Sequence, residues 1–134
     1  MNKNLDPESI RPWGYYEILL DEPYCKVKRI VVKPNQRLSY QYHGKRQEAW
    51  TVVSGVATIT IDGETKNYNA GETVLIPLGA KHRMANEKSE DMIIVEVQTG
   101  TYFGEDDIIR IEDDYERNSN HDHKINLWKP KWEW

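Results

Sequence analysis

Short runs of β-branched and aromatic residues, separated by turn residues, make up most of the chain before residue 105. Within this stretch no apolar stripe recurs with the period of about 3.6 residues that an α-helix requires. The pattern predicts an all-β fold in which short strands pack as a sandwich or a jelly-roll barrel. The strand candidates are residues 26–33, 37–43, 48–61, 73–76 and 92–98.

Turn residues divide these runs and indicate where the chain reverses. Pro34-Asn35 ends the first run, and Asp62-Gly63 is a hairpin signal. Gly55 predicts a turn or bend inside residues 48–61, because an interior glycine weakens a strand. Residues 105–117 are expected to form a strand and then a turn.

Length and composition indicate one small domain, which we expect over residues 1–117. The net charge of −4 argues against a nucleic-acid partner, because phosphate backbones require clustered positive charge. A single cysteine, Cys25, excludes a disulfide framework. We find neither an apolar run of membrane-spanning length nor a signal peptide, so we expect a cytoplasmic location without membrane binding.

The end of the chain, residues 118–134, is rich in tryptophan. Trp128, Trp132 and Trp134 all stand there. Such a tail is expected to dock on its own barrel or on a second subunit, because exposed indole rings are costly in water. The histidines at 121 and 123 stand in a polar loop and are interpreted as solvated.

Four side chains carry donors suited to one metal ion. Gln41 and His43 are two residues apart in a strand candidate, so they point to the same face. A short loop lets Glu48 return on the neighbouring strand, and the turn before His82 can aim that imidazole back into a barrel. Two imidazoles, a carboxylate and an amide oxygen suit one divalent ion, with zinc favoured and cobalt, manganese, nickel or magnesium as alternatives.

The spacing of these residues resembles the two sequence motifs of the cupin superfamily. The second motif, G-x5-P-x-G-x2-H-x3-N, is matched at Gly71, Pro77, Gly79, His82 and Asn86. The first, G-x5-H-x-H-x4-E-x6-G, is matched at His43, Glu48 and Gly55, with Asn35 and Gln41 in place of its first glycine and first histidine. The resemblance implies a cupin double-stranded β-helix, which is a jelly-roll barrel.

Six blocks along the chain resemble one cupin family more closely, the type II mannose-6-phosphate isomerase domain. The blocks are residues 11–16, 27–32, 37–43, 50–55, 76–83 and 105–110. In that family the cupin is usually the C-terminal half of an enzyme whose other half is a mannose-1-phosphate guanylyltransferase. The resemblance implies metal ligands at Gln41, His43, Glu48 and His82, and interconversion of mannose 6-phosphate and fructose 6-phosphate. We expect a stand-alone cupin of this kind, and a homodimer.

The chain departs from the family beside the metal ligands. The family's His-His-His-Arg run is His43-Gly44-Lys45-Arg46 here, and its Glu-His-Trp is Glu48-Ala49-Trp50. If one of the missing imidazoles shuttles a proton, this chain is a weaker isomerase or acts on another sugar.

A metal-dependent isomerase needs three kinds of group. The metal would stabilise the enediolate, and a base would move the proton between carbons. The base is left open, with Glu48, Lys81 and Arg83 as candidate catalytic residues and Lys45 as a further candidate base. The phosphate of a sugar phosphate needs cations, for which the candidates are Arg11, Arg46 and Arg110.

Two other functions remain open. The chain could be a non-catalytic cupin that binds a sugar or nucleotide sugar and partners a separate guanylyltransferase, which the missing imidazoles favour. It could also be another cupin enzyme, such as an epimerase or an oxygenase. Gln41 speaks against the oxygenase, whose iron site usually has three histidines or two histidines and a carboxylate.

Overall fold

The computed structural model describes residues 6–115, and nearly all of its regular structure is β-strand. The all-β prediction is therefore confirmed. Within the described residues the strands are β1 (Ile10–Arg11), β2 (Gly14–Glu22), β3 (Cys25–Val32), β4 (Gln36–Arg37), β5 (Tyr40–Tyr42), β6 (Arg46–Ser54), β7 (Val56–Ile61), β8 (Glu64–Asn69), β9 (Thr73–Ile76), β10 (His82–Asn86), β11 (Met92–Gly100) and β12 (Ile109–Glu112). Two short 3-10 helices, η1 (Pro7–Ser9) and η2 (Glu105–Asp107), complete the elements.

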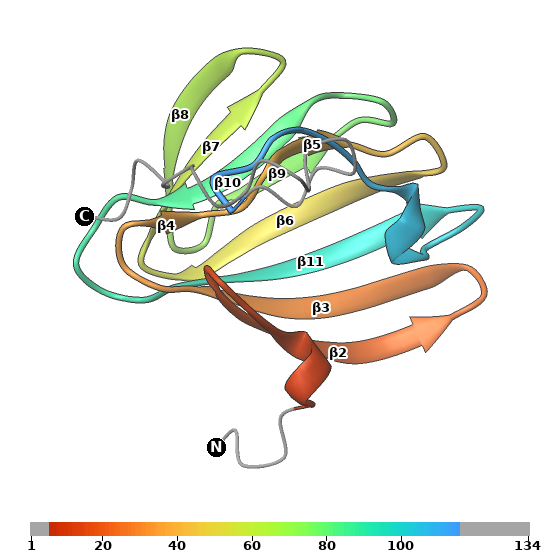
Figure 1. Cartoon of the computed structure of the whole chain (residues 1–134), viewed down its shortest axis with the longest axis horizontal. Coiled ribbons are helices and arrows are strands. Elements are labelled where there is room, and N and C mark those ends of the chain that lie inside the picture. Colours follow the sequence, from red (N-terminus) through yellow and green to blue (C-terminus); the bar gives the residue numbers. More distant parts are fainter. Residues whose placement is uncertain (1–5, 116–134) are drawn as a thin grey trace.

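The strands form two antiparallel sheets that face each other. The first has the order β1-β2-β3-β11-β6-β9, and the second has the order β12-β5-β10-β7-β8, with β4 pairing to β10. Figure 1 shows β3, β11 and β6 side by side, and the segment with η2 and β12, drawn in blue, returns past their ends. The chain crosses repeatedly between the sheets, which is the topology of a jelly roll.

The interior between the sheets has an apolar end and a polar end. Alternation along β6 turns every second side chain inward, so the inner face reads Arg46, Glu48, Trp50 and Val52. On the paired strand β11 the inner face runs in the opposite direction, from Met92 and Ile94 to Glu96 and Gln98. Because the strands are antiparallel, Glu48 lies opposite Gln98 and Val52 lies opposite Ile94. The polar residues of both strands therefore meet at one end of the barrel.

The apolar end carries the hydrophobic core. Its centre is made of side chains that are almost completely withdrawn from water, and it packs both sheets together. Its most buried members are Val32, Val52, Ala57, Ile59, Met84, Met92 and Ile94.

Several strands carry weak sequence signals. Residues 64–69 (β8) are almost all polar and exposed, since this strand is the outer partner of β7. Residues 82–86 (β10), which pair with β5 and β7, are buried throughout and so lack the alternation of a half-exposed strand. The predicted division of residues 48–61 at Gly55 is confirmed, and residues 105–115 form η2, β12 and a turn.

Asn35 explains one of the motif substitutions. Its φ of 61° lies in the left-handed region, where glycine is the usual residue and asparagine is among the best-tolerated replacements. The tryptophan-rich segment 118–134 lies outside the described residues, as do His121 and His123. Among residues 6–115 we find no helix of the length and apolarity needed to cross a bilayer.

A pair of glycine substitutions tests how tightly the β6–β7 turn is packed. Gly55 and Gly63 both have positive φ, 83° and 86°, but a Cβ on Gly55 would lie 2.7 Å from the carbonyl oxygen of Asp91. A Cβ on Gly63 meets nothing within 4 Å. We expect Gly63→Ala to lower the free energy of unfolding by about 1 kcal/mol and Gly55→Ala by about 2–4 kcal/mol, measured by urea denaturation. Equal losses would show that the turn relaxes freely.

Candidate metal centre

A cavity opens into the polar end of the barrel and is lined by both sheets and by the segment around η2. It has an empty volume of about 610 Å³, which includes space that opens to solvent. Its lining residues that carry polar or charged groups are Arg11, Trp13, Tyr16, Lys28, Ser39, Gln41, His43, Arg46, Glu48, Trp50, His82, Arg83, Glu96, Glu105 and Arg110.

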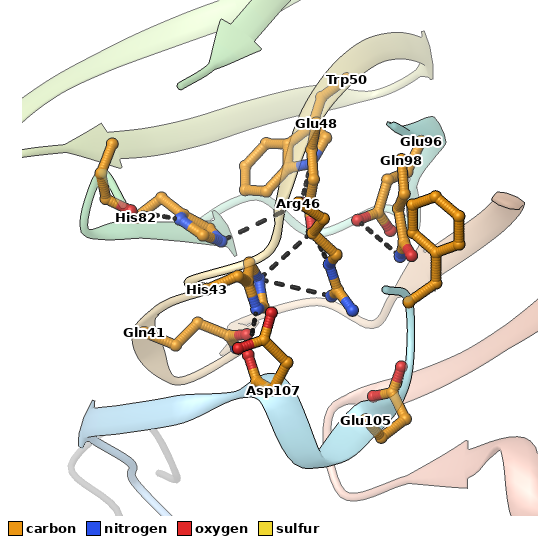
Figure 2. Close-up of polar contacts among 12 residues, drawn as sticks. Gln41, His43, Arg46, Glu48, Trp50, His82, Glu96, Gln98, Glu105 and Asp107 are labelled. Carbon is orange, nitrogen blue, oxygen red and sulfur yellow. Dashed lines mark hydrogen bonds and ion pairs between the residues drawn. The ribbon is translucent and has the colours of Figure 1, made fainter. Parts of the chain in front are cut away.

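Three of the four predicted ligands converge on one point in this cavity. His43 follows β5, Glu48 lies on β6, and His82 begins β10. One donor atom from each lies within 4.8 Å of the others, and all three side chains are buried. Figure 2 shows both imidazoles turned toward the carboxylate of Glu48, although they come from segments nearly forty positions apart.

The backbone sets the tautomer of both histidines. Nδ1 of His43 lies 3.0 Å from the carbonyl oxygen of Asp107, and Nδ1 of His82 lies 2.9 Å from that of Ala80. A carbonyl oxygen only accepts, so each Nδ1 carries the proton and donates it. In the neutral rings the lone pair is therefore on Nε2, which faces Glu48 in both cases. Burial lowers the pKa of His82 below its ordinary value, which favours the neutral ring that binds metal.

Glu48 is a buried carboxylate with donors on both oxygens. The indole N–H of Trp50 donates to Oε1 at 2.8 Å, and Nε of Arg46 donates to Oε2 at 2.9 Å. Nε2 of His43 lies 3.2 Å from Oε2. Burial acts to raise the pKa of Glu48, but its polar contacts with His43 and Glu96 outweigh burial, so the pKa lies well below its usual range. Glu48 is therefore the anionic centre of the site.

Glu96 is a second buried acid beside Glu48, and it behaves in the opposite way. Burial, followed by the negative charge of Glu48, raises the pKa of Glu96 well above its usual range. Its side chain is hydrogen-bonded to Glu48, and Nε2 of Gln98 donates to its Oε2 at 3.2 Å. Two adjacent carboxyl groups cannot both ionise cheaply in a low dielectric, so Glu96 holds the proton that Glu48 lacks.

The donor set fits a divalent metal ion. Two imidazole Nε2 atoms and one carboxylate are the ligands that zinc and related ions take in proteins, and their mutual separations suit bonds of about 2.0–2.2 Å to a shared ion. Gln41, the fourth predicted ligand, lines the same cavity, and His82 lies opposite it in the β5–β10 register. Its amide nitrogen donates to Oγ of Ser39 at 2.7 Å.

The predicted cations divide into those inside and those outside the cavity. Arg11, Arg46, Arg83 and Arg110 all line it. Arg83 is held by the carbonyl oxygen of Leu38 and by Glu112, at 2.9 Å each.

Lys81 is exposed and outside the cavity lining, because β10 turns His82 inward. Lys45 is exposed as well, with its ammonium 5.4 Å from the ring centre of Tyr102. The structure therefore does not bring Lys81 and Lys45 together with the residues that line the cavity.

The positions where the family has further histidines also lie away from the cavity. Gly44 and Lys45 are exposed, and their backbone N–H groups donate to the carboxylate of Asp107 at 3.1 and 2.9 Å. Ala49 lies on β6 between two inward-facing residues, so its side chain is on the outer face of the sheet. None of these three lines the cavity, so their substitution leaves the described metal donors intact.

Two charged cavity residues, Lys28 and Glu96, were not predicted as site residues by the sequence analysis. Lys28 is buried on β3 and forms an ion pair of 2.9 Å with Glu105 on η2, which closes one side of the cavity. Glu96 stands in the most apolar strand of the chain, and an acid at an inward position of such a strand is a usable signal. The Lys28–Glu105 contact has no such signal, because it joins residues 77 positions apart.

Comparison with known proteins identifies relatives of the chain. A family model described as Mannose-6-phosphate isomerase C-terminal matches residues 2–113. A mannose-1-phosphate guanylyltransferase of Salmonella montevideo is 45% identical over 111 residues, which cover 83% of this chain and 24% of that protein. The alginate biosynthesis protein AlgA of Pseudomonas aeruginosa is 45% identical over 112 residues, covering 84% and 23%. The chain thus spans about a quarter of the length of these relatives.

Solved structures share the fold. An uncharacterized conserved protein with a double-stranded β-helix domain from Klebsiella pneumoniae superposes with a TM-score of 0.64 at 26% identity, over 72% of this chain and 88% of that one. The predicted cupin double-stranded β-helix is therefore confirmed.

The raised pKa of Glu96 predicts a pH-dependent gain in stability from Glu96→Gln. Glu96 stays protonated in the folded wild type, whereas in the unfolded chain it ionises above a pKa of about 4.3. Between the unfolded and the folded pKa, the free energy of unfolding of the wild type therefore falls by up to about 1.4 kcal/mol per pH unit. Glutamine is neutral at every pH and keeps a hydrogen-bond donor. The variant should therefore gain stability over wild type as pH rises from about 5 to about 7 in chelator, measured by urea denaturation.

The matched control is Glu64→Gln on the exposed strand β8, which should change stability by less than about 0.5 kcal/mol at both pH values. A Glu96→Gln difference that is constant with pH, or that falls as pH rises, would contradict a protonated Glu96.

Proposed function

The chain belongs to the mannose-6-phosphate isomerase C-terminal family, and we propose that it acts there as a non-catalytic cupin that binds a sugar phosphate or nucleotide sugar and partners a mannose-1-phosphate guanylyltransferase. The relatives named as mannose-1-phosphate guanylyltransferases support the proposed partner. The cavity of the polar end supports the ligand class, because it combines cations with a candidate metal centre.

The prediction that the chain is a stand-alone mannose-6-phosphate isomerase is wrong. The curated relatives are named as mannose-1-phosphate guanylyltransferases and as alginate and xanthan biosynthesis proteins, and the chain matches only about a quarter of their length. The alternative of a cupin that accompanies a guanylyltransferase fits these relatives better.

One observation carries the proposal of binding without catalysis, namely that the carboxyl groups and the lysine that line the described cavity are already engaged. Glu96 is the protonated member of the carboxyl pair, and Glu48 is paired with Arg46. Lys28, the one lining lysine, is paired with Glu105. An aldose–ketose isomerase needs a base within reach of a carbon-bound proton. In the described cavity Glu48 and Lys28 would first have to leave their partners to act as that base.

The cavity nevertheless suits an anionic sugar ligand. Arg11 and Arg110 line it in addition to the more deeply buried Arg46, and guanidinium groups bind phosphate oxygens well. A metal ion would be held by Nε2 of His43 and His82 and by the carboxylate of Glu48. The side-chain carbonyl of Gln41 is the fourth donor, and zinc is the ion that we favour. When bound, such an ion supplies a Lewis acid for an oxygen of the ligand.

Binding and turnover measured on the same zinc-loaded sample test this function. Calorimetry with mannose 1-phosphate, mannose 6-phosphate and GDP-mannose should give saturable binding of at least one ligand. A coupled assay of mannose 6-phosphate isomerisation should give no turnover above that of the chelated protein. Arg110→Gln should weaken binding about tenfold, because it removes a charge-assisted contact.

Lys66→Gln on the exposed strand β8 is the control, and its affinity should equal that of wild type. Metal-dependent isomerase turnover would overturn the non-catalytic role. Absence of binding for all three compounds would overturn the ligand class.

A further inference from the structure

Arg46 lies inside the candidate metal centre, in contact with two of its donors. Its Nε donates to Oε2 of Glu48 at 2.9 Å, and its Nη2 lies 3.3 Å from Nε2 of His43. The side chain is only 4% exposed. Figure 2 shows the guanidinium beside the carboxylate and the imidazole, joined to both by dashed lines.

The atoms that Arg46 contacts are those that a metal ion would need. The other nitrogen of His43 is committed to the carbonyl oxygen of Asp107, so Nε2 holds the ring's available lone pair. The other oxygen of Glu48 accepts the indole N–H of Trp50 at 2.8 Å. A guanidinium has donors and no acceptor, so the Nη2 contact uses the His43 lone pair itself. Arginine and metal therefore compete for the same electrons.

Charge adds to this competition. Arg46 and ionised Glu48 together are neutral, so a divalent ion placed beside them would leave about two positive charges in a buried site by simple charge count. Repulsion between a guanidinium and a metal ion is strong where little water screens it. With a neutral side chain at position 46 the same ion would leave about one positive charge.

The guanidinium is also incompletely satisfied where it lies. Its third nitrogen, Nη1, is buried and has no hydrogen-bond partner among the described residues. An unsatisfied buried donor is destabilising, so the contacts of Arg46 with Glu48 and His43 are made at a cost.

We propose that Arg46 is an internal cation that occupies the metal-binding lone pairs of His43 and Glu48, so that a metal ion binds only by displacing it and binds more weakly because of it. The inference concerns the metal alone. It stands whether or not the cavity binds a sugar ligand.

If Arg46 instead supported metal binding, its replacement would lower the metal affinity and not raise it. If Arg46 served only to orient Glu48 toward the metal, it would be an outer-shell partner, and its loss would cost about 10–100-fold in metal affinity. A competing cation predicts a gain instead. Damage to the fold also lowers affinity, so tighter binding can be produced only by the competition.

The test is the zinc affinity of Arg46→Gln and Arg46→Met, measured without sugar by competition with a chromophoric chelator, and repeated with cobalt by its visible absorption. Both variants should bind zinc about tenfold more tightly than wild type. Methionine keeps the apolar stem of the side chain, so it retains more of the packing than smaller residues. Arg46→Lys keeps the charge and should stay near the wild-type affinity.

Arg29→Gln is the matched control, because Arg29 is paired with Glu17 and does not line the cavity. Its zinc affinity should be unchanged, which excludes a general effect of net charge. Zinc binding by both neutral variants that is equal to or weaker than that of wild type would overturn the proposal. Because no sugar is present, that result is distinct from a failure of ligand binding.

Discussion

The buried carboxylate of Glu48 is the interaction on which the site depends. An ionised acid withdrawn from water costs several kcal/mol unless opposite charge and hydrogen bonds surround it. Here both oxygens accept from β6 itself, through Arg46 and Trp50, because alternation along a strand places residues 46, 48 and 50 on one face. His43 and His82 approach from the opposite sheet, and protonated Glu96 completes the shell from β11. One negative charge thus organises groups from both sheets.

The same arrangement links the fold to its chemistry. Antiparallel pairing of β6 with β11 gathers polar side chains at one end of the barrel and leaves the other end to the hydrophobic core. The site can therefore be opened to a ligand without exposing the core. The segment around η2 contributes twice, since the backbone of Asp107 fixes the tautomer of His43 and Glu105 neutralises Lys28. The relatives include a mannose-1-phosphate guanylyltransferase and an alginate biosynthesis protein, and these names agree with the proposal that the pocket recognises a charged sugar compound.

The sequence predicted the parts of this site that have a local spacing. The positions of His43, Glu48 and His82 follow from two short motifs, and strand alternation and Gly55 follow from simple periodicity and turn chemistry. It could not predict contacts between distant residues, such as Lys28 with Glu105. Alternation already turns Ala49 outward once Glu48 faces inward, but the exposure of Lys81 depends on where β10 begins, which the sequence did not show. The sequence comparison made the missing imidazoles look like a change in the site, whereas in the structure Gly44, Lys45 and Ala49 do not line the cavity.

Anomalous diffraction at the zinc edge, from crystals of the zinc-loaded protein, tests the central claim most directly. The account predicts one ion bound by Nε2 of both His43 and His82 and by Glu48, at about 2.0–2.2 Å. It also predicts that Arg46 has left Nε2 of His43, to which its Nη2 lies at 3.3 Å in the computed structure. An ion bound elsewhere, or a site that stays empty in excess zinc with Arg46 still in contact with His43, would contradict it.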